Sequence, residues 1–203
     1  MLTAPSLLAE LDASLAEAPA PWRHGVLRRI VDLFLDDAAR YADEQVGLFD
    51  EVICRLIADI ERLPLVELSN RLAGVDKAPV RAVVALARHR DPAVHGPVLV
   101  NSRALPDRDL AEIAAAEQAG IDVLGKIAAR AELSEAVTDV LLKRGDAQIR
   151  RAVIANANAR ISESGYARLV AGSNGDKKLA AAVAARDDVP AELKPFLAAT
   201  LNA

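Results

Sequence analysis

Two pairs of basic residues are the side chains in this sequence best placed to do chemistry. Arg150 and Arg151 occupy early positions in one predicted helix, and Lys177 and Lys178 occupy matching positions in the next repeat. Stacking of those helices would gather the pairs into a basic strip suited to phosphates or acidic side chains. The alternative is an ordinary solvated helix face, where cations in a first turn oppose the helix dipole and gain nothing from it.

Amide and guanidinium side chains recur near the predicted turns between helices. As a functional feature they would form a ladder that hydrogen-bonds an extended peptide, with Asn156 lying near the basic pairs. As a structural feature they satisfy free carbonyl groups at helix ends. The structural interpretation is the simpler one, and the sequence leaves both open. The set comprises Asn101, Arg130, Asn156, Asn158 and Arg186.

The sequence holds three histidines and one cysteine, a poor set for a metal site or a nucleophile. His89 and His95 flank a turn at Asp91, but without a second matching pair the pattern favours surface histidines near helix ends. Cys54 lies among apolar residues, which indicates inert packing, and a single cysteine excludes an intramolecular disulfide. We therefore expect no metal.

The loop from Gly172 to Lys178 has only a faint likeness to a phosphate-binding loop. Its glycine spacing differs from that pattern and Asp176 would repel a phosphate, so we expect a plain turn with Asp176 as a helix cap. Sequence signatures of serine hydrolases, zinc proteases and dinucleotide-binding enzymes are absent. We expect a protein that is not an enzyme and needs no cofactor.

Composition points to a soluble helical protein. Of 203 residues, 52% are hydrophobic but only 3% are aromatic, and 27% are charged. Small aliphatic side chains allow helices to approach closely. No apolar run approaches the roughly 18 residues that span a bilayer. The first residues carry acidic groups and no Lys or Arg, unlike a signal peptide. We expect a cytoplasmic protein that does not enter a membrane.

Charge is distributed unevenly along the chain. Residues 1–62 hold 6 Lys/Arg and 12 Asp/Glu, a formal charge of −6; residues 143–203 hold 10 and 6, a charge of +4. Such a field can steer a charged partner or another copy of the chain, although solvated surfaces also produce it.

Four apolar residues set the period of the C-terminal half. Leu105, Leu133, Ile161 and Val189 are each 28 residues apart, and each precedes a helix-starting Pro or Ser. A fixed period of about 20–50 residues is typical of a solenoid built from one supersecondary unit. No period-two strand pattern occurs. The predicted fold is all-α, a right-handed HEAT-like α-solenoid of short helix pairs with a period of about 28 residues.

Longer helices precede the repeats. Leucines at helical spacing predict a short helix over 7–15, and prolines end it before Trp22. Two amphipathic helices over 22–38 and 43–61 then form a predicted hairpin. This divides the chain into a hairpin or cap, residues 1–62, and repeats, residues 63–203, unless the two form one continuous domain. The last helix is predicted to run from Pro190 to Leu201.

Several sequence blocks resemble the bacterial domain-of-unknown-function family 2336. They are Val31 to Leu35, Asp43 to Val52, Leu133 to Leu141 and Arg151 to Ser162, and the similarity runs from about residue 20 onward. The resemblance implies a HEAT-like helical protein of bacterial, mostly alphaproteobacterial, type. It implies no activity, so it transfers no catalytic role to any residue here.

The sequence favours a binding function. We expect a non-enzymatic scaffold or adaptor that holds another protein through an acidic segment, with contacts from Arg150, Arg151, Asn156, Lys177 and Lys178. One alternative is self-association, either between the acidic and basic ends or through Phe34 and Phe49 of the hairpin. The other is nucleic-acid binding, which the acidic net charge of −4 and scarce aromatic residues make the less favoured alternative.

Overall fold

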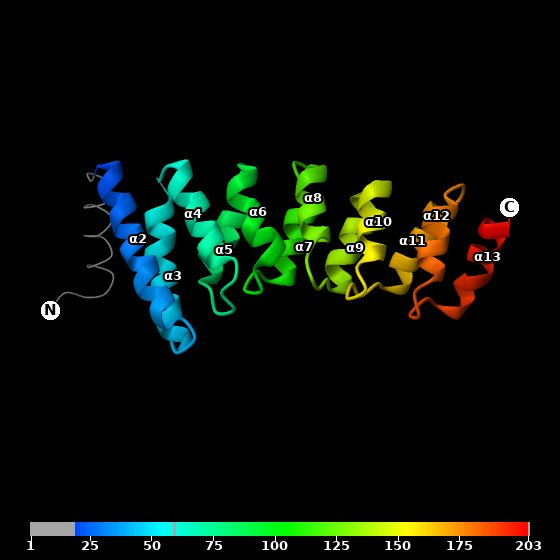
Figure 1. Cartoon of the computed structure of the whole chain (residues 1–203), viewed down its shortest axis with the longest axis horizontal. Coiled ribbons are helices and arrows are strands. Elements are labelled where there is room, and N and C mark those ends of the chain that lie inside the picture. The colour runs from blue at the N-terminus through cyan, green and yellow to red at the C-terminus, as the bar shows by residue number, and fades with distance from the viewer. Residues whose placement is uncertain (1–18, 59, 203) are drawn as a thin grey trace. The chain divides into compact units, whose positions relative to one another are not determined.

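The computed structural model describes residues 19–58 and 60–202, and every regular element in those ranges is a helix (Figure 1). The predicted helix over 7–15 lies outside the described residues. The elements, in chain order, are α2 (Ala20–Asp37), α3 (Asp43–Ile57), α4 (Arg62–Leu72), α5 (Val80–Ala87), α6 (Pro92–Asn101), α7 (Asp107–Ala115), α8 (Ile121–Ala128), α9 (Glu135–Arg144), α10 (Ala147–Ala155), α11 (Glu163–Gly172), α12 (Lys177–Ala184), the 3₁₀ turn η1 (Ala191–Leu193) and α13 (Lys194–Asn202).

The chain divides into two compact units. The first comprises residues 1–98 and 102–105, and the second comprises residues 99–101 and 106–203. The predicted boundary at residue 62 falls inside the first unit, where α3 packs against α5. A separate domain at residues 1–62 stays a prediction.

The first unit is built on the hairpin of α2 and α3, as the sequence predicts. Phe34 is fully buried in it, and the rings of Phe34 and Tyr41 both lie against Phe49, with centroids 5.2 and 5.1 Å from it. Aromatic pairs in this range add specific contact energy to the area they bury. Because Phe34 is enclosed within the hairpin, that ring is not available for a contact between two copies.

A buried carboxylate joins α3 to the start of α5. Asp50, 7% exposed, accepts hydrogen bonds from the backbone N–H groups of Arg81 at 2.9 Å and Ala82 at 2.8 Å. The first N–H groups of a helix have no partner inside the helix, so this side chain from α3 acts as the cap that α5 lacks locally. The residue before α5, Pro79, makes no capping hydrogen bond.

The second unit consists of successive helix pairs. In one row α9 packs against both α7 and α11, and in the other α10 packs against both α8 and α12 (Figure 1). The helices are short, 8 to 10 residues from α7 to α12, and apolar side chains fill the space between the rows. Helices of this length are marginal alone, so packing between neighbouring pairs supplies most of their stability.

The four residues spaced 28 apart all lie in the core. Leu105, Leu133, Ile161 and Val189 are 2%, 4%, 8% and 6% exposed. Between two of these segments, the backbone N–H of Arg160 donates to the carbonyl of Leu133 at 2.9 Å. The period read from the sequence therefore marks equivalent buried positions at the turns that precede α7, α9, α11 and α13.

Two predicted boundaries are wrong. The last helix does not begin at Pro190: a 3₁₀ turn comes first and α13 starts at Lys194, since Pro195 fits only the first turn of a helix. The second helix of the predicted hairpin, expected over 43–61, begins at Asp43 but ends at Ile57. Within the described residues no helix is both long enough and apolar enough to cross a membrane.

Candidate functional site

The structure brings all four predicted basic residues to the turn between α11 and α12. Arg151 of α10 lies 3.3 Å from the carboxylate of Asp176, which caps α12 by accepting from the N–H of Leu179 at 3.0 Å. The predicted cap role of Asp176 is confirmed. Lys177 follows directly and is exposed, as is Lys178.

Arg150 reaches the same turn from α10. A Cβ atom placed on Gly172 would lie 3.1 Å from Arg150 Nη1, so the guanidinium lies close to the backbone at the end of α11. A side chain at position 172 would push it away. Its position, half-buried over the helix end, fits the preference of cations for helix C-termini.

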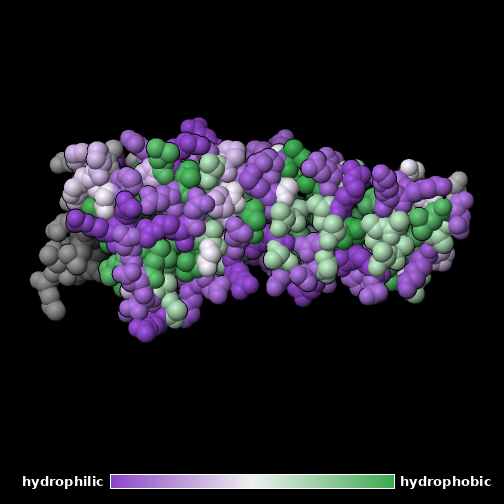
Figure 2. Space-filling model, viewed as in Figure 1, coloured by the Kyte–Doolittle hydropathy of each residue, from purple (hydrophilic) through white to green (hydrophobic). Residues whose placement is uncertain are grey.

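An open, mostly apolar groove lies beside this turn, between α11 and α13. It has a volume of about 800 Å³. Phe196 is 62% exposed on one side of it, whereas Val170 of α11 forms part of its buried wall. Figure 2 shows apolar side chains at the surface among these C-terminal helices. The lining residues are Ala167, Val170, Ala171, Asn174, Gly175, Lys177, Leu193, Phe196, Ala199 and Thr200.

The groove exists because the last helix breaks the packing pattern. The helices α7, α9 and α11 pack in one row, but α13 packs against α12 instead of closing on α11. Leu197 is buried at 1% exposure, while Phe196, one residue earlier, points away from the core. The sequence placed Phe196 on the apolar face of the last helix, and nothing in its spacing predicts the groove.

Four of the five members of the predicted amide and guanidinium set, all but Asn101, bind backbone carbonyls of an earlier repeat. Arg130 Nη1 donates to the carbonyl of Leu99 at 2.8 Å, Asn156 Nδ2 to that of Arg130 at 2.7 Å, and Arg186 Nη1 to that of Asn156 at 2.9 Å. Each side chain binds a carbonyl 26 to 31 residues earlier, close to one repeat. We call these three bonds the rungs; each ties a carbonyl at or near the end of a helix to a side chain of a later repeat.

Asn156 differs from the basic residues with which it was predicted to act. Its amide nitrogen forms a rung, and its amide oxygen accepts from the N–H of Asn158 at 3.0 Å. Both polar atoms of this amide already hold a bond within the chain, which leaves one N–H and one oxygen lone pair for any further contact. Its role as a contact residue stays a prediction, whereas its role in joining repeats is visible in the structure.

The last rung ends in a buried tyrosine. Tyr166 donates to Asp188 at 2.5 Å and accepts from Arg186 Nε at 2.9 Å. Burial, with the hydrogen bond to Asp188, raises the pKa of Tyr166 to about 12. Hydrogen bonding from Arg186 lowers the pKa of Asp188 to about 2. Arg186 keeps its charge, since Asp188 raises its pKa further. Near neutral pH, Tyr166 therefore stays protonated, Asp188 stays ionised and Arg186 stays charged, as expected for a structural contact.

Cys54 is not set up as a nucleophile. Burial raises the pKa of its thiol to about 11, and the nearby Asp50 carboxylate, 3.6 Å from Sγ, acts in the same direction. The reactive form of a cysteine is the thiolate, so this thiol stays protonated and unreactive near neutral pH. The predicted packing role fits its half-buried position.

The histidines around Asp91 are engaged in local backbone contacts. His89 Nδ1 accepts from the N–H of Asp91 at 3.0 Å, and His95 Nδ1 lies 2.9 Å from the carbonyl of His89. The expectation of surface histidines is wrong for His95, which is 4% exposed because α6 turns it inward. Among the described residues, no three His, Cys, Asp or Glu side chains are placed to hold a metal ion.

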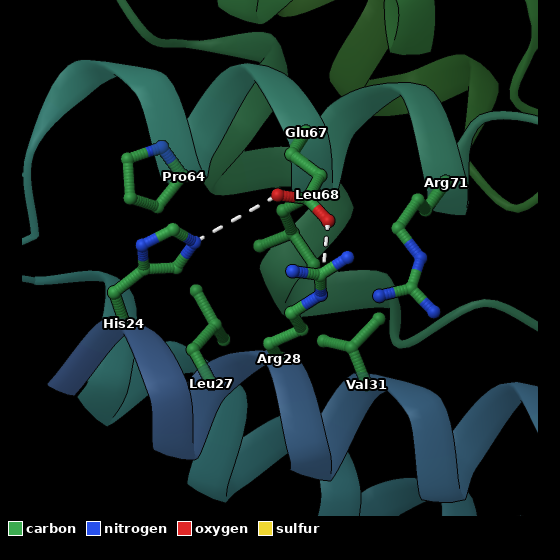
Figure 3. Close-up of a pocket in the computed structure, with 8 residues that line it drawn as sticks. All are labelled: His24, Leu27, Arg28, Val31, Pro64, Glu67, Leu68 and Arg71. Atoms are coloured by element: carbon green, nitrogen blue, oxygen red, sulfur yellow. Dashed lines mark ion pairs between the residues drawn. The ribbon is translucent and has the colours of Figure 1, made fainter. Parts of the chain in front are cut away.

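A second, much smaller pocket lies between α2 and α4 in the first unit. Glu67 of α4 faces His24 and Arg28 of α2, at 3.7 and 3.6 Å (Figure 3). The enclosed space is about 10 Å³, roughly that of one water molecule. It therefore holds no organic ligand, and its charged groups join two helices.

These features define an all-α protein of packed short helices, with a groove at one end of its second unit. The chain belongs to a family described as an uncharacterised protein conserved in bacteria (DUF2336), whose model matches residues 94–203. The resemblance seen in the sequence is thus confirmed over that range, and the blocks before residue 94 lie outside the match. No curated protein and no solved structure matches the chain.

Proposed function

We propose that this protein is a HEAT-like α-solenoid that serves as a non-enzymatic scaffold, holding an acidic protein segment in the groove between α11 and α13. The observation that carries the proposal is the groove itself, where the exposed ring of Phe196 lies opposite α11 and Lys177 adds a positive charge at the edge. An apolar groove with one charged border suits an amphipathic helix from a partner.

The packing of the second unit supports the solenoid proposal. Equivalent helices lie side by side in two rows, and the rungs tie each repeat to its neighbour. Solenoids of this type present an extended surface whose side chains set the function, and they need no cofactor. The 28-residue period and the short paired helices support the HEAT-like class, and the right-handed sense is part of the proposal.

The basic residues play two parts in this proposal. Lys177 and Lys178 are exposed, and the side chain of neither forms an ion pair or hydrogen bond within the described part of the chain. They are the primary contacts for an acidic partner. Arg150 and Arg151 hold the turn that presents those lysines, through Gly172 and Asp176, and their outer surfaces extend the same positive field.

The test is affinity capture from a bacterial extract with three full-length proteins. We expect a protein partner to bind the wild type and the Lys143→Glu control, and to be lost with Lys177→Glu/Lys178→Glu. Lys143 is an exposed cation at the end of α9, away from the groove lining. Arg151→Glu is avoided because it would repel Asp176 and disturb the α12 cap.

Two results would reject the proposed site. A partner that binds all three proteins equally would place the binding surface elsewhere. A partner released by nuclease treatment would favour nucleic-acid binding, which then predicts affinity that falls steeply with salt.

A further inference from the structure

The groove between α11 and α13 has two requirements for an occupant. Its walls are mostly apolar, with Val170, Leu193 and Phe196 as the largest apolar side chains, so the occupant needs an apolar face. Lys177 lines the groove and Lys178 follows it, which favours an occupant with acidic residues beside that face. The surrounding stretch, residues 143–203, has a formal charge of +4.

The first 18 residues of the chain have the matching chemistry. Leu7, Leu8, Leu11 and Leu15 fall on one face of a helix at 100° per residue. The same segment contains three acidic residues, at positions 10, 12 and 17, and no Lys or Arg. In that helical pattern positions 10 and 12 fall on either side of the apolar face, so one of them can face Lys177 at the edge of the groove.

The lengths also agree. A helix over residues 6–17 would be about 18 Å long at 1.5 Å per residue. The groove runs beside α11, which has 10 residues and is therefore about 15 Å long. About three turns of helix would cover the exposed ring of Phe196 and complete the row of α7, α9 and α11, which α13 leaves open.

We propose that the groove between α11 and α13 binds residues 1–18 of a second copy of this chain. The inference rests on the proposed function, because it names the occupant of the same groove. Groove and segment are different surfaces, and each copy carries one of each, so the contact is head-to-tail and can continue from copy to copy. The acidic N-terminal third and the basic C-terminal third supply the matching charges.

Two full-length variants test this arrangement. Phe196→Asp places a charge in the groove and leaves the N-terminal segment intact. Leu8→Asp/Leu11→Asp breaks the apolar face of the segment and leaves the groove intact. Phe196 is 62% exposed, so we expect its replacement to leave the fold unchanged, as circular dichroism and thermal melting will check.

Light scattering then distinguishes head-to-tail pairing from other modes. We expect the mass of the wild type to rise with concentration, with the rise reduced by salt, and each variant alone to remain monomeric. A mixture of the two variants in equal amounts has one intact groove and one intact segment per pair, so it should form a dimer and nothing larger. Association in the mixture also proves that the groove of Leu8→Asp/Leu11→Asp is folded, while circular dichroism checks the fold of Phe196→Asp.

Three results would overturn the inference. They are a wild type that is monomeric at every concentration, a mixture that stays monomeric, and a Phe196→Asp variant that associates as the wild type does. A monomeric wild type whose Leu8→Asp/Leu11→Asp variant binds a labelled peptide of residues 1–18 would show that the segment fills the groove of its own chain.

The same peptide separates this inference from the proposed function. We expect it to bind Leu8→Asp/Leu11→Asp, whose groove is free, and to bind Phe196→Asp at least about tenfold more weakly. If the peptide does not bind while a cellular partner is still lost with Lys177→Glu/Lys178→Glu, the self-association inference fails and the scaffold function stands. If neither the peptide nor a cellular partner binds, both the self-association inference and the scaffold function fail.

Discussion

The rungs and the groove are built from the same repeated helices of the second unit, yet they differ in what they leave for a partner. At the rungs, Arg130, Asn156 and Arg186 direct their polar groups to carbonyls of the preceding repeat. At the groove, the apolar ring of Phe196 and the ammonium group of Lys177 are both exposed to solvent. Polar residues with regular spacing therefore hold repeats together, while the irregular last helix creates the surface that can bind.

This contrast predicts that the largest loss of stability follows from breaking a rung. Arg186→Ala removes hydrogen bonds to Asn156, Ala159 and Tyr166 from a side chain that is 12% exposed. We expect the free energy of unfolding to fall by about 2–4 kcal/mol in chemical denaturation. The matched control is Arg168→Ala on the exposed side of α11, which should change it by less than about 0.5 kcal/mol. Equal effects would show that the rungs are not stabilising.

A smaller loss is expected at the middle rung. Asn156→Ala removes the bond to Arg130 and the turn bond to Asn158, and should cost about 1–2 kcal/mol by the same measurement. Capture of a partner by the folded variant should match the wild type. If capture is lost while stability is unchanged, Asn156 is a contact residue after all.

The last rung should also be sensitive to acid. Hydrogen bonding from Arg186 lowers the pKa of Asp188 to about 2 in the folded chain, below the ordinary value of about 4. A lowered pKa contributes stability that is present above pH 4 and is lost as pH falls toward 2. The melting temperature of the wild type should therefore drop across this window. Asp188→Asn should have a lower melting temperature at neutral pH and a smaller drop across this window. If the melting temperatures of both proteins fall equally with pH, the stabilising contact between Arg186 and Asp188 is contradicted.

The smallest change in stability is expected at the groove. Phe196→Ala removes an exposed ring and should alter the free energy of unfolding by less than about 0.5 kcal/mol, although it weakens binding. Thermal melting measures the change in stability, and light scattering measures the change in binding between copies. A clear loss of stability would mean that Phe196 is packed, and the difference between groove and rungs would disappear.

Much of the fold follows from residue spacing. The 28-residue period identified Leu105, Leu133, Ile161 and Val189, all of which are buried, and the recurrence of Asn and Arg at helix ends identified the rungs. Both patterns recur because each repeat packs against its neighbour through equivalent positions. This recurrence allows them to be detected in a single sequence.

The groove could not be predicted, because it depends on a departure from the repeat. Pro195 shifts the start of α13, and the helix then packs against α12 while Phe196 stays exposed. Spacing alone places Phe196 and Leu197 on the same apolar surface. The buried histidine was missed for a similar reason, since His95 is turned inward by α6 rather than by its own polarity.

The cap that Asp50 provides for α5 determines where the chain can be cut. A fragment that starts near residue 62 would leave the first N–H groups of α5 without an acceptor, and the complementary fragment would keep a buried carboxylate without donors. The start of α5 therefore depends on a carboxylate of α3, about 30 residues earlier in the chain. A shortened version of this protein should begin ahead of α2, so that donor and acceptor stay on one polypeptide.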